Sequence, residues 1–94
     1  MYVSVVSLWE IAVKARIGKL EADTKELIGL TVPSGFRQLD LRASHLIQLV
    51  ELPVFPDHRD PFDQLLIAQA KAEALVFLSA DPRLRRYPVA FQPA

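Results

Sequence analysis

Residues 60–82 read DPFDQLLIAQAKAEALVFLSADP, so an Asp-Pro dipeptide stands at each end of one helix-prone segment and one apolar segment. An aspartate followed by proline is a strong signal for the start of a helix. The carboxylate accepts hydrogen bonds from N–H groups that lack partners in the first turn, and proline has no N–H that needs one. We therefore expect a helix to begin near Pro61, with Asp60 as its cap.

Two further aspartates in this stretch are candidates for a functional site. Asp63 falls in the first turn of the expected helix, where the helix dipole favours negative charge. The segment 75–78, LVFL, is short, apolar and β-prone, as in a strand buried on both faces, and Asp81 follows it. Ligand sites of open parallel sheets gather at the carboxyl ends of the strands. Asp63 and Asp81 could therefore meet at such an end.

The N-terminal part of the chain predicts a strand followed by a helix. Residues 2–6 are strand-like, and the run LWEIAVKARIGK at 8–19 has the helical spacing of apolar residues. Ser4 or Ser7 could cap this helix, and Gly18 is a plausible stop because glycine readily adopts the left-handed conformation at a helix end.

Further elements follow from the same signals. We expect a short helical segment at 24–30, a strand at 36–41, a helix at 44–52, a helical turn at 82–86 and a strand at 89–91. Ser44 is the expected cap of the 44–52 helix, and Pro53 ends it. The expected inner face of this helix consists of Leu46, Leu49 and Val50.

Composition limits the classes of protein to which the chain can belong. Its 94 residues are 51% hydrophobic and 23% charged, which is a globular composition of single-domain length. Eleven basic and eleven acidic residues leave no net charge, so any contact with nucleic acid has to come from a local cluster. The absence of cysteine excludes disulfides and thiolate metal sites, and no apolar run has the roughly 18 residues that span a bilayer. We expect a soluble, cytoplasmic protein without a membrane partner.

Strands and helices alternate through most of the chain. This alternation is typical of an α/β fold with a short, mostly parallel sheet covered by helices. The chain starts almost directly with a strand, without a preceding strand–helix unit. We therefore expect residues 1–94 to form a single domain that is incomplete at its N-terminus.

Three blocks in this order and spacing resemble PIN-domain toxins of the VapC type. They are VSVVSLWEIAVK at 3–14 with GKL at 18–20, HRDPFDQLLIAQA at 58–70, and SADP at 79–82. The likeness covers nearly the whole chain. It implies a three-layer PIN-like fold that lacks the family's N-terminal strand and helix.

The resemblance implies a magnesium-dependent ribonuclease that dimerises and is neutralised by a VapB-like antitoxin. By position, Glu10, Asp63 and Asp81 match three of the family's acidic residues, which hold Mg²⁺, or Mn²⁺ in its place. No residue matches the acidic residue at the end of the family's first strand. Magnesium is usually held by one or two protein carboxylates together with water and substrate phosphate, so the three residues could still supply a site.

Each candidate ligand also has an ordinary structural alternative. Glu10 stands four residues before Lys14, a spacing that allows an ion pair on a helix. Asp63 could reach back to the N–H of Asp60 in a capping box, and Asp81 could cap a turn that begins at Pro82. The cap explains Asp60 fully.

Other residues have weaker functional interpretations. Arg59, beside the acidic helix start, and Lys14 are candidates for contact with RNA phosphate. For His45 and His58 we favour ordinary surface histidines over phosphate contact or proton transfer, and Trp9 belongs to the core or to a dimer surface.

One position departs from the resemblance. Relatives often have glycine where this chain has Ala74, at the expected end of the long helix. A left-handed alanine there costs roughly 1 kcal/mol or more, unless the turn is built differently.

Two functions remain open. The first is the toxin of a type II toxin-antitoxin system, an endoribonuclease that hydrolyses RNA phosphodiesters by metal-assisted chemistry. The alternative is a truncated, catalytically inactive PIN remnant that acts only through an antitoxin or through self-association.

Overall fold

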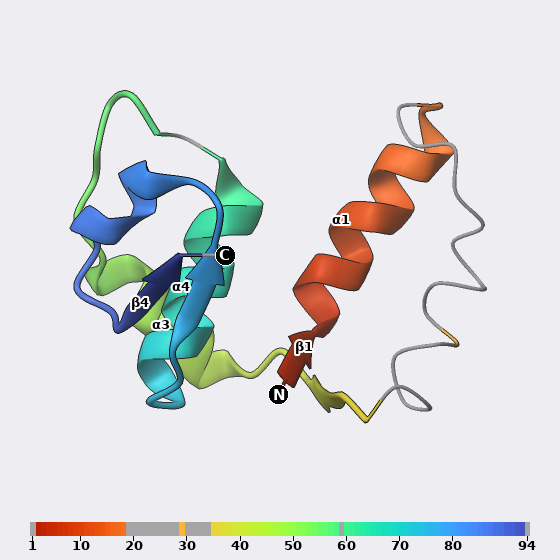
Figure 1. Ribbon diagram of the computed structural model, residues 1–94, viewed down its shortest axis with the longest axis horizontal. Coiled ribbons are helices and arrows are strands. Elements are labelled where there is room, and N and C mark those ends of the chain that lie inside the picture. Colours follow the sequence, from red (N-terminus) through yellow and green to blue (C-terminus); the bar gives the residue numbers. More distant parts are fainter. Residues whose placement is uncertain (1, 19–28, 30–34, 59, 94) are drawn as a thin grey trace. The chain divides into compact units, whose positions relative to one another are not determined.

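The computed structural model describes residues 2–18, 29, 35–58 and 60–93, and its chain divides into two units, Met1–Leu41 and Arg42–Ala94. In the N-terminal unit, β1 (Tyr2–Ser4) leads directly into α1 (Val5–Arg16), and β2 (Arg37–Leu39) follows later. The C-terminal unit contains α3 (Ala43–Glu51), α4 (Pro61–Ala72), β3 (Phe77–Ser79), the 3-10 helix η1 (Pro82–Arg86) and β4 (Phe91–Pro93) (Figure 1). The expected helical segment at 24–30 lies outside the described residues apart from Gly29.

The N-terminal unit is built around the junction between β1 and α1. Ser4 caps α1, because its Oγ accepts the N–H of Val6 at 3.0 Å. Helix α1 therefore begins at Val5, and the expected strand at 2–6 is two residues too long. β1 pairs in parallel with β2, Ser4 lying opposite Leu39. At the other end, Gly18 has the positive φ of 77° that its predicted role as a stop requires.

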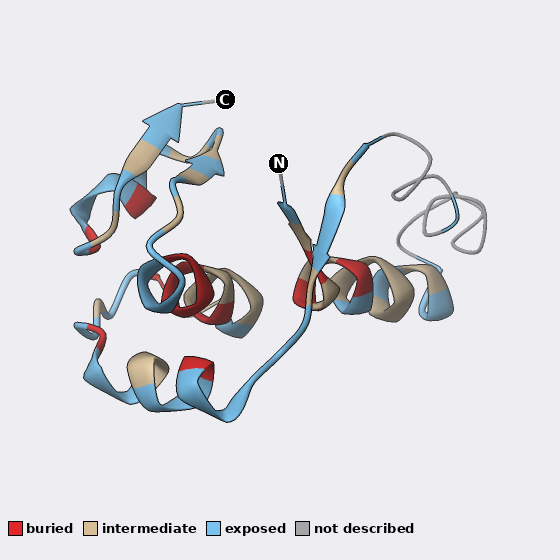
Figure 2. Cartoon of the chain, turned by 90° about the horizontal axis from the view of Figure 1, so that it is seen from below, coloured by how far each residue is buried: buried red, intermediate tan, exposed pale blue. Residues whose placement is uncertain are grey.

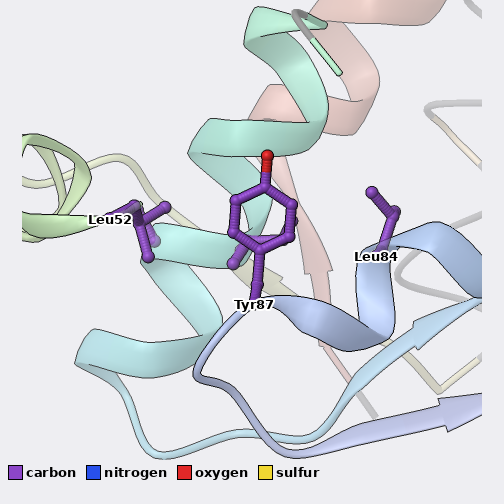
Figure 3. Close-up of a cluster of buried hydrophobic side chains, with 5 residues drawn as sticks. Leu52, Leu84 and Tyr87 are labelled. Carbon is purple, nitrogen blue, oxygen red and sulfur yellow. The ribbon is translucent and has the colours of Figure 1, made fainter. Parts of the chain in front are cut away.

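The C-terminal unit depends on α4 for its core. Helix α4 begins at Pro61 as predicted, with Asp60 as its cap. The buried cluster combines α4 with residues from the segments before and after it, namely Leu52, Ile67, Ala68, Leu84 and Tyr87. Figure 3 shows Leu52, Leu84 and Tyr87 of this cluster. Full burial of a large apolar side chain contributes about 1.5–3 kcal/mol, so these few side chains supply much of the unit's stability.

Helix α3 presents a different face to the core than predicted. Leu49 and Leu52 pack inward, but Leu46 is exposed and Val50 is 85% exposed. The third inward residue is His45, which is 0% exposed. His45, Leu49 and Leu52 stand at helical spacing, so the true face follows from treating the histidine as a core residue.

His45 also replaces the expected cap of α3. The helix begins at Ala43, before Ser44, and the His45 Nδ1 accepts the N–H of Arg42 at 3.0 Å. Since Nδ1 is an acceptor, Nε2 carries the proton and donates to Glu73 Oε1 at 2.7 Å. The expectation that His45 is a surface residue is therefore wrong.

Strands β3 and β4 form a parallel pair in which Phe77 lies opposite Phe91. The expectation of a strand at 75–78 that is buried on both faces is wrong. Phe77 packs against the core cluster, whereas Leu78, which points to the opposite face, is 49% exposed. Neither β3 nor β4 contains a residue of the buried class, which is red in Figure 2. Helices and short parallel strands occur in both units, as the predicted α/β class requires.

The end of α4 is formed by a left-handed alanine. Ala74 has a φ of 54°, its N–H donates to the carbonyl of Lys71 at 3.3 Å, and the N–H of Leu75 donates to that of Ala70 at 2.8 Å. These two bonds define a Schellman motif, a helix ending whose left-handed residue is usually glycine. The predicted strain at Ala74 is therefore present in the structure.

Within the described ranges, no helix is long and apolar enough to cross a membrane.

Candidate functional site

Asp63 lies in the first turn of α4, but it is not the residue that caps the helix. Oδ1 of Asp60 accepts the N–H groups of both Phe62, at 2.9 Å, and Asp63, at 3.3 Å. The Asp63 carboxylate instead approaches a histidine, with its Oδ2 3.3 Å from Nε2 of His58. The capping and the contact with histidine are thus made by two different aspartates of the same turn.

His58 is a buried histidine with partners on both ring nitrogens. It is 5% exposed, so the expectation of a surface histidine is wrong. Its Nδ1 lies 2.8 Å from the hydroxyl oxygen of Tyr87, and its carbonyl accepts the side-chain N–H of Gln64 at 3.2 Å. The sequence gives little local sign of this role, because Tyr87 follows His58 by 29 residues.

Asp81 lies just beyond β3 and performs two structural tasks. Its Oδ1 caps η1 by accepting the N–H of Arg83 at 3.0 Å, and its carboxylate forms a two-pronged pair with the guanidinium of the same residue, the Oδ2–Nη2 distance being 2.8 Å. The Oγ of Ser79 in turn accepts the N–H of Asp81 at 3.1 Å. The hydrogen bonds from Arg83 lower the pKa of Asp81 from 3.8 to about 2, so this carboxyl is ionised at neutral pH.

The two aspartates are held by different partners in the C-terminal unit. Asp63 contacts the buried His58, and Asp81 pairs with the exposed Arg83. The hydrogen bonds with Asp81 raise the pKa of Arg83.

A model of the PIN domain family matches residues 1–90. The chain belongs to the PIN domain family. PIN domains are generally metal-dependent nucleases and have an α/β fold, in agreement with the class seen here. None of the curated proteins searched matches the chain.

The donor set of this PIN domain fits a divalent cation only in a minimal way. Within the described part of the chain, no three His, Asp or Glu side chains are grouped closely enough to hold a metal ion. Magnesium, however, often binds only one or two protein carboxylates and completes its octahedron with water and phosphate oxygens. Asp63 and Asp81 could supply such a pair. A cation at Asp81 would have to replace the guanidinium of Arg83, which contacts both carboxylate oxygens.

The third candidate ligand, Glu10, lies on α1 in the N-terminal unit. Its Oε2 is 3.1 Å from Nζ of Lys14, so the ordinary alternative of an i,i+4 ion pair is realised. Lys14, a candidate for phosphate contact, is the partner in this pair. Trp9 on the same helix is 55% exposed, which rules out the core and leaves the surface alternative. Arg59, the other candidate for phosphate contact, lies outside the described residues.

Proposed function

We propose that this PIN domain is a magnesium-dependent endoribonuclease and the toxin of a type II toxin-antitoxin system of the VapC type. Membership of the family supports nuclease chemistry. The three sequence blocks that resemble VapC toxins support the narrower activity. The observation that carries the proposal is the match to the PIN domain family, together with the positions of two motif aspartates, Asp63 in the first turn of α4 and Asp81 directly before η1.

We propose Asp63 and Asp81 as residues that would hold Mg²⁺, or Mn²⁺ in its place, and we keep Glu10 as a third candidate ligand on the strength of the resemblance to VapC toxins. A divalent ion held there would supply the chemistry of metal-assisted hydrolysis, namely polarisation of the scissile phosphate and a lower pKa for an attacking water. Asp81 is ionised in the neutral range, and the guanidinium of Arg83 would have to move aside before this carboxylate could bind a cation. Lys14 and Arg59 are proposed to contact the RNA backbone, which positions the strand without selecting its sequence.

We further propose a VapB-like antitoxin as partner, a homodimer as the assembly and the cytoplasm, where the RNA substrate resides, as the compartment. These proposals rest on the resemblance to VapC toxins. A cognate antitoxin is expected to bind the purified chain and to inhibit RNA cleavage in proportion to the amount added. Binding without any effect on cleavage would contradict the role as toxin.

One observation favours a second candidate function, a catalytically silent PIN domain that acts through an antitoxin or through itself. Arg83 occupies both carboxylate oxygens of Asp81 in a geometry that is complete without a metal. If the pair persists in the presence of Mg²⁺, Asp81 does not serve as a ligand. The chain would then retain the family's fold and its protein contacts without hydrolysis.

Cleavage of single-stranded RNA and transfer RNA by the purified chain tests the proposal. We expect Mg²⁺-dependent cleavage that EDTA abolishes and that Asp63→Asn reduces by at least about 100-fold, the scale on which removal of one charge-stabilising group acts. Asp57→Asn is the matched control, because Asp57 is an aspartate of the same unit that pairs with Arg86 outside the motif residues. Absence of cleavage at high enzyme and Mg²⁺ concentrations would favour the silent domain. Cleavage that survives both EDTA and Asp63→Asn would come from a contaminant.

A further inference from the structure

His58 is a buried ionisable side chain to which the proposed chemistry gives no role. It stands between Asp63, at 3.3 Å from Nε2, and Tyr87, at 2.8 Å from Nδ1. The buried imidazole thus has both ring nitrogens engaged, one by each of these two groups. These hydrogen bonds join Tyr87, in the core of the C-terminal unit, through His58 to Asp63, a proposed metal ligand.

The donor and acceptor roles along this connection follow from the chemistry of its ends. A carboxylate can only accept hydrogen bonds, so an ionised Asp63 requires the proton on Nε2 of His58. In the neutral imidazole, Nδ1 then has a lone pair and accepts the O–H of Tyr87. The direction is therefore Tyr87 to His58 to Asp63. Burial raises the pKa of Tyr87, so its hydroxyl stays protonated and can donate a hydrogen bond.

The Tyr87 end of the connection is fixed by packing. Tyr87 is one of the buried cluster residues, and its ring meets that of Phe55 edge-on, with 4.9 Å between centroids. The backbone of His58 is fixed as well, since Gln64 on α4 donates to its carbonyl. The ring of His58 is thus held by Tyr87, and its main chain is held by Gln64.

We infer that Tyr87 and His58 are positioning residues that set the orientation of the Asp63 carboxylate for cation binding. The inference rests on the proposed function, because it takes Asp63 as a metal ligand. Hydrogen-bonded partners behind a ligand typically change metal affinity or activity about 10- to 100-fold. The effect acts through Asp63, and neither positioning residue is required to touch the metal or the RNA.

Mn²⁺ binding to the full chain, measured by electron paramagnetic resonance, tests the inference without relying on activity. We expect His58→Leu to weaken binding about 10- to 100-fold and Tyr87→Phe to weaken it up to about tenfold. His58→Gln, whose amide can donate to Asp63, should recover part of the affinity lost in His58→Leu. Tyr87→Phe keeps the buried ring, so it remains informative if His58→Leu does not fold.

His45→Gln is the matched control, because His45 is also buried in this unit but donates to Glu73. We expect it to leave Mn²⁺ affinity unchanged at a temperature where circular dichroism shows all variants folded. In cleavage assays, Tyr87→Phe should raise the Mg²⁺ concentration that gives half-maximal rate while leaving the KM for RNA unchanged.

The outcomes separate the inference from the proposed function. If the wild-type chain binds no Mn²⁺, the proposed metal site fails, and the inference falls with it. If the wild-type chain binds Mn²⁺ and both Tyr87→Phe and His58→Leu bind it equally well, the inference is overturned and the metal site stands. An equal loss in His45→Gln would show general loosening of the unit and would also overturn the inference.

Discussion

The two Asp-Pro starts of the C-terminal unit use the same dipeptide in different ways. At the start of α4, Asp60 accepts the first N–H groups, and Asp63 contacts the buried His58. At the start of η1, Asp81 alone is both the cap and the partner of Arg83. Because Asp60 caps α4, the carboxylate of Asp63 is available to contact the buried His58. Asp81 caps η1 itself, and its partner Arg83 is only two residues away in the sequence.

The supports of the two carboxylates also differ in burial. His58 is almost completely enclosed, while the side chain of Arg83 is 59% exposed. An exposed ion pair typically contributes about 0–1 kcal/mol, but removing one member of a buried hydrogen-bonded group costs about 1–3 kcal/mol for the partner left unpaired. Substitution of His58, at the start of α4, should therefore lower the free energy of unfolding much more than substitution of Arg83, at the start of η1.

Truncation of the buried support should have the largest effect. We expect His58→Ala to lower the free energy of unfolding by about 3 kcal/mol, because it leaves a cavity and removes the partner of the Tyr87 hydroxyl. Urea denaturation measures the change. Arg83→Ala is the counterpart at the η1 start and should lower the free energy of unfolding much less, because an exposed ion pair contributes little. Equal costs would break the comparison.

The division of labour within α4 predicts the next largest effect. Asp60→Ala should lower the free energy of unfolding by about 1–2 kcal/mol, the usual cost of losing a helix cap. Asp63→Asn should cost less, because its N–H still donates to Asp60. Thermal and urea unfolding of the two variants give the order. A larger loss for Asp63→Asn would mean that Asp63 contributes more than Asp60 to the start of the helix.

The two ends of α4 also differ, because Asp60 caps its start whereas the left-handed Ala74 strains its end. Ala74→Gly should raise the free energy of unfolding by about 0.5–1 kcal/mol, since relief of the left-handed alanine outweighs the greater entropy of unfolded glycine. Ala72→Gly, inside the last helical turn, is the control and should lower it by about 1 kcal/mol. If both variants were destabilised alike, the strain at Ala74 would be negligible.

The smallest effect concerns the titration of Asp81. NMR should give its carboxyl a pKa of about 2, and Arg83→Gln should move that pKa upward toward 3.8. A carboxyl whose pKa is lowered by folding stabilises the folded state above its unfolded pKa and loses this contribution as the pH falls through its folded pKa. The stability difference between wild type and Arg83→Gln should therefore be present at about pH 5 and vanish near pH 2. A difference that persists at the lower pH would contradict the ion pair as its source.

Local signals in the sequence predicted the start of α4 and the end of α1, and Ser4 was one of the two caps expected for α1, whereas the expected cap Ser44 of α3 was wrong. The caps Ser4 and Asp60 and the stop at Gly18 each act on N–H or carbonyl groups only a few residues away. Such groups are visible in a short window of sequence. The α/β class follows from the same windows in order. The strained ending at Ala74 was accessible only because the resemblance pointed to a glycine position.

The histidines show where sequence reasoning stops. His45 and His58 have partners 28 and 29 residues away, Glu73 and Tyr87, and burial of an imidazole depends on such distant partners. Placing His45 on the surface also shifted the expected inner face of α3 toward Val50. The aspartates of the candidate site were proposed from motif position, but His58, which contacts Asp63, is buried and is held there by the core residue Tyr87.

The left-handed backbone of Ala74 bears on which stereoisomer of alanine suits this position. The left-handed region is crowded for an L-residue because of the direction of its Cβ, and it is the favoured region for the mirror-image residue. At this position of the chain, D-alanine would fit the backbone that the Schellman motif imposes, with the same methyl group and without the freedom of glycine in the unfolded state. In a chain assembled by chemical ligation, D-alanine at position 74 would invert a single stereocentre and leave the hydrogen bonds that end α4 in place.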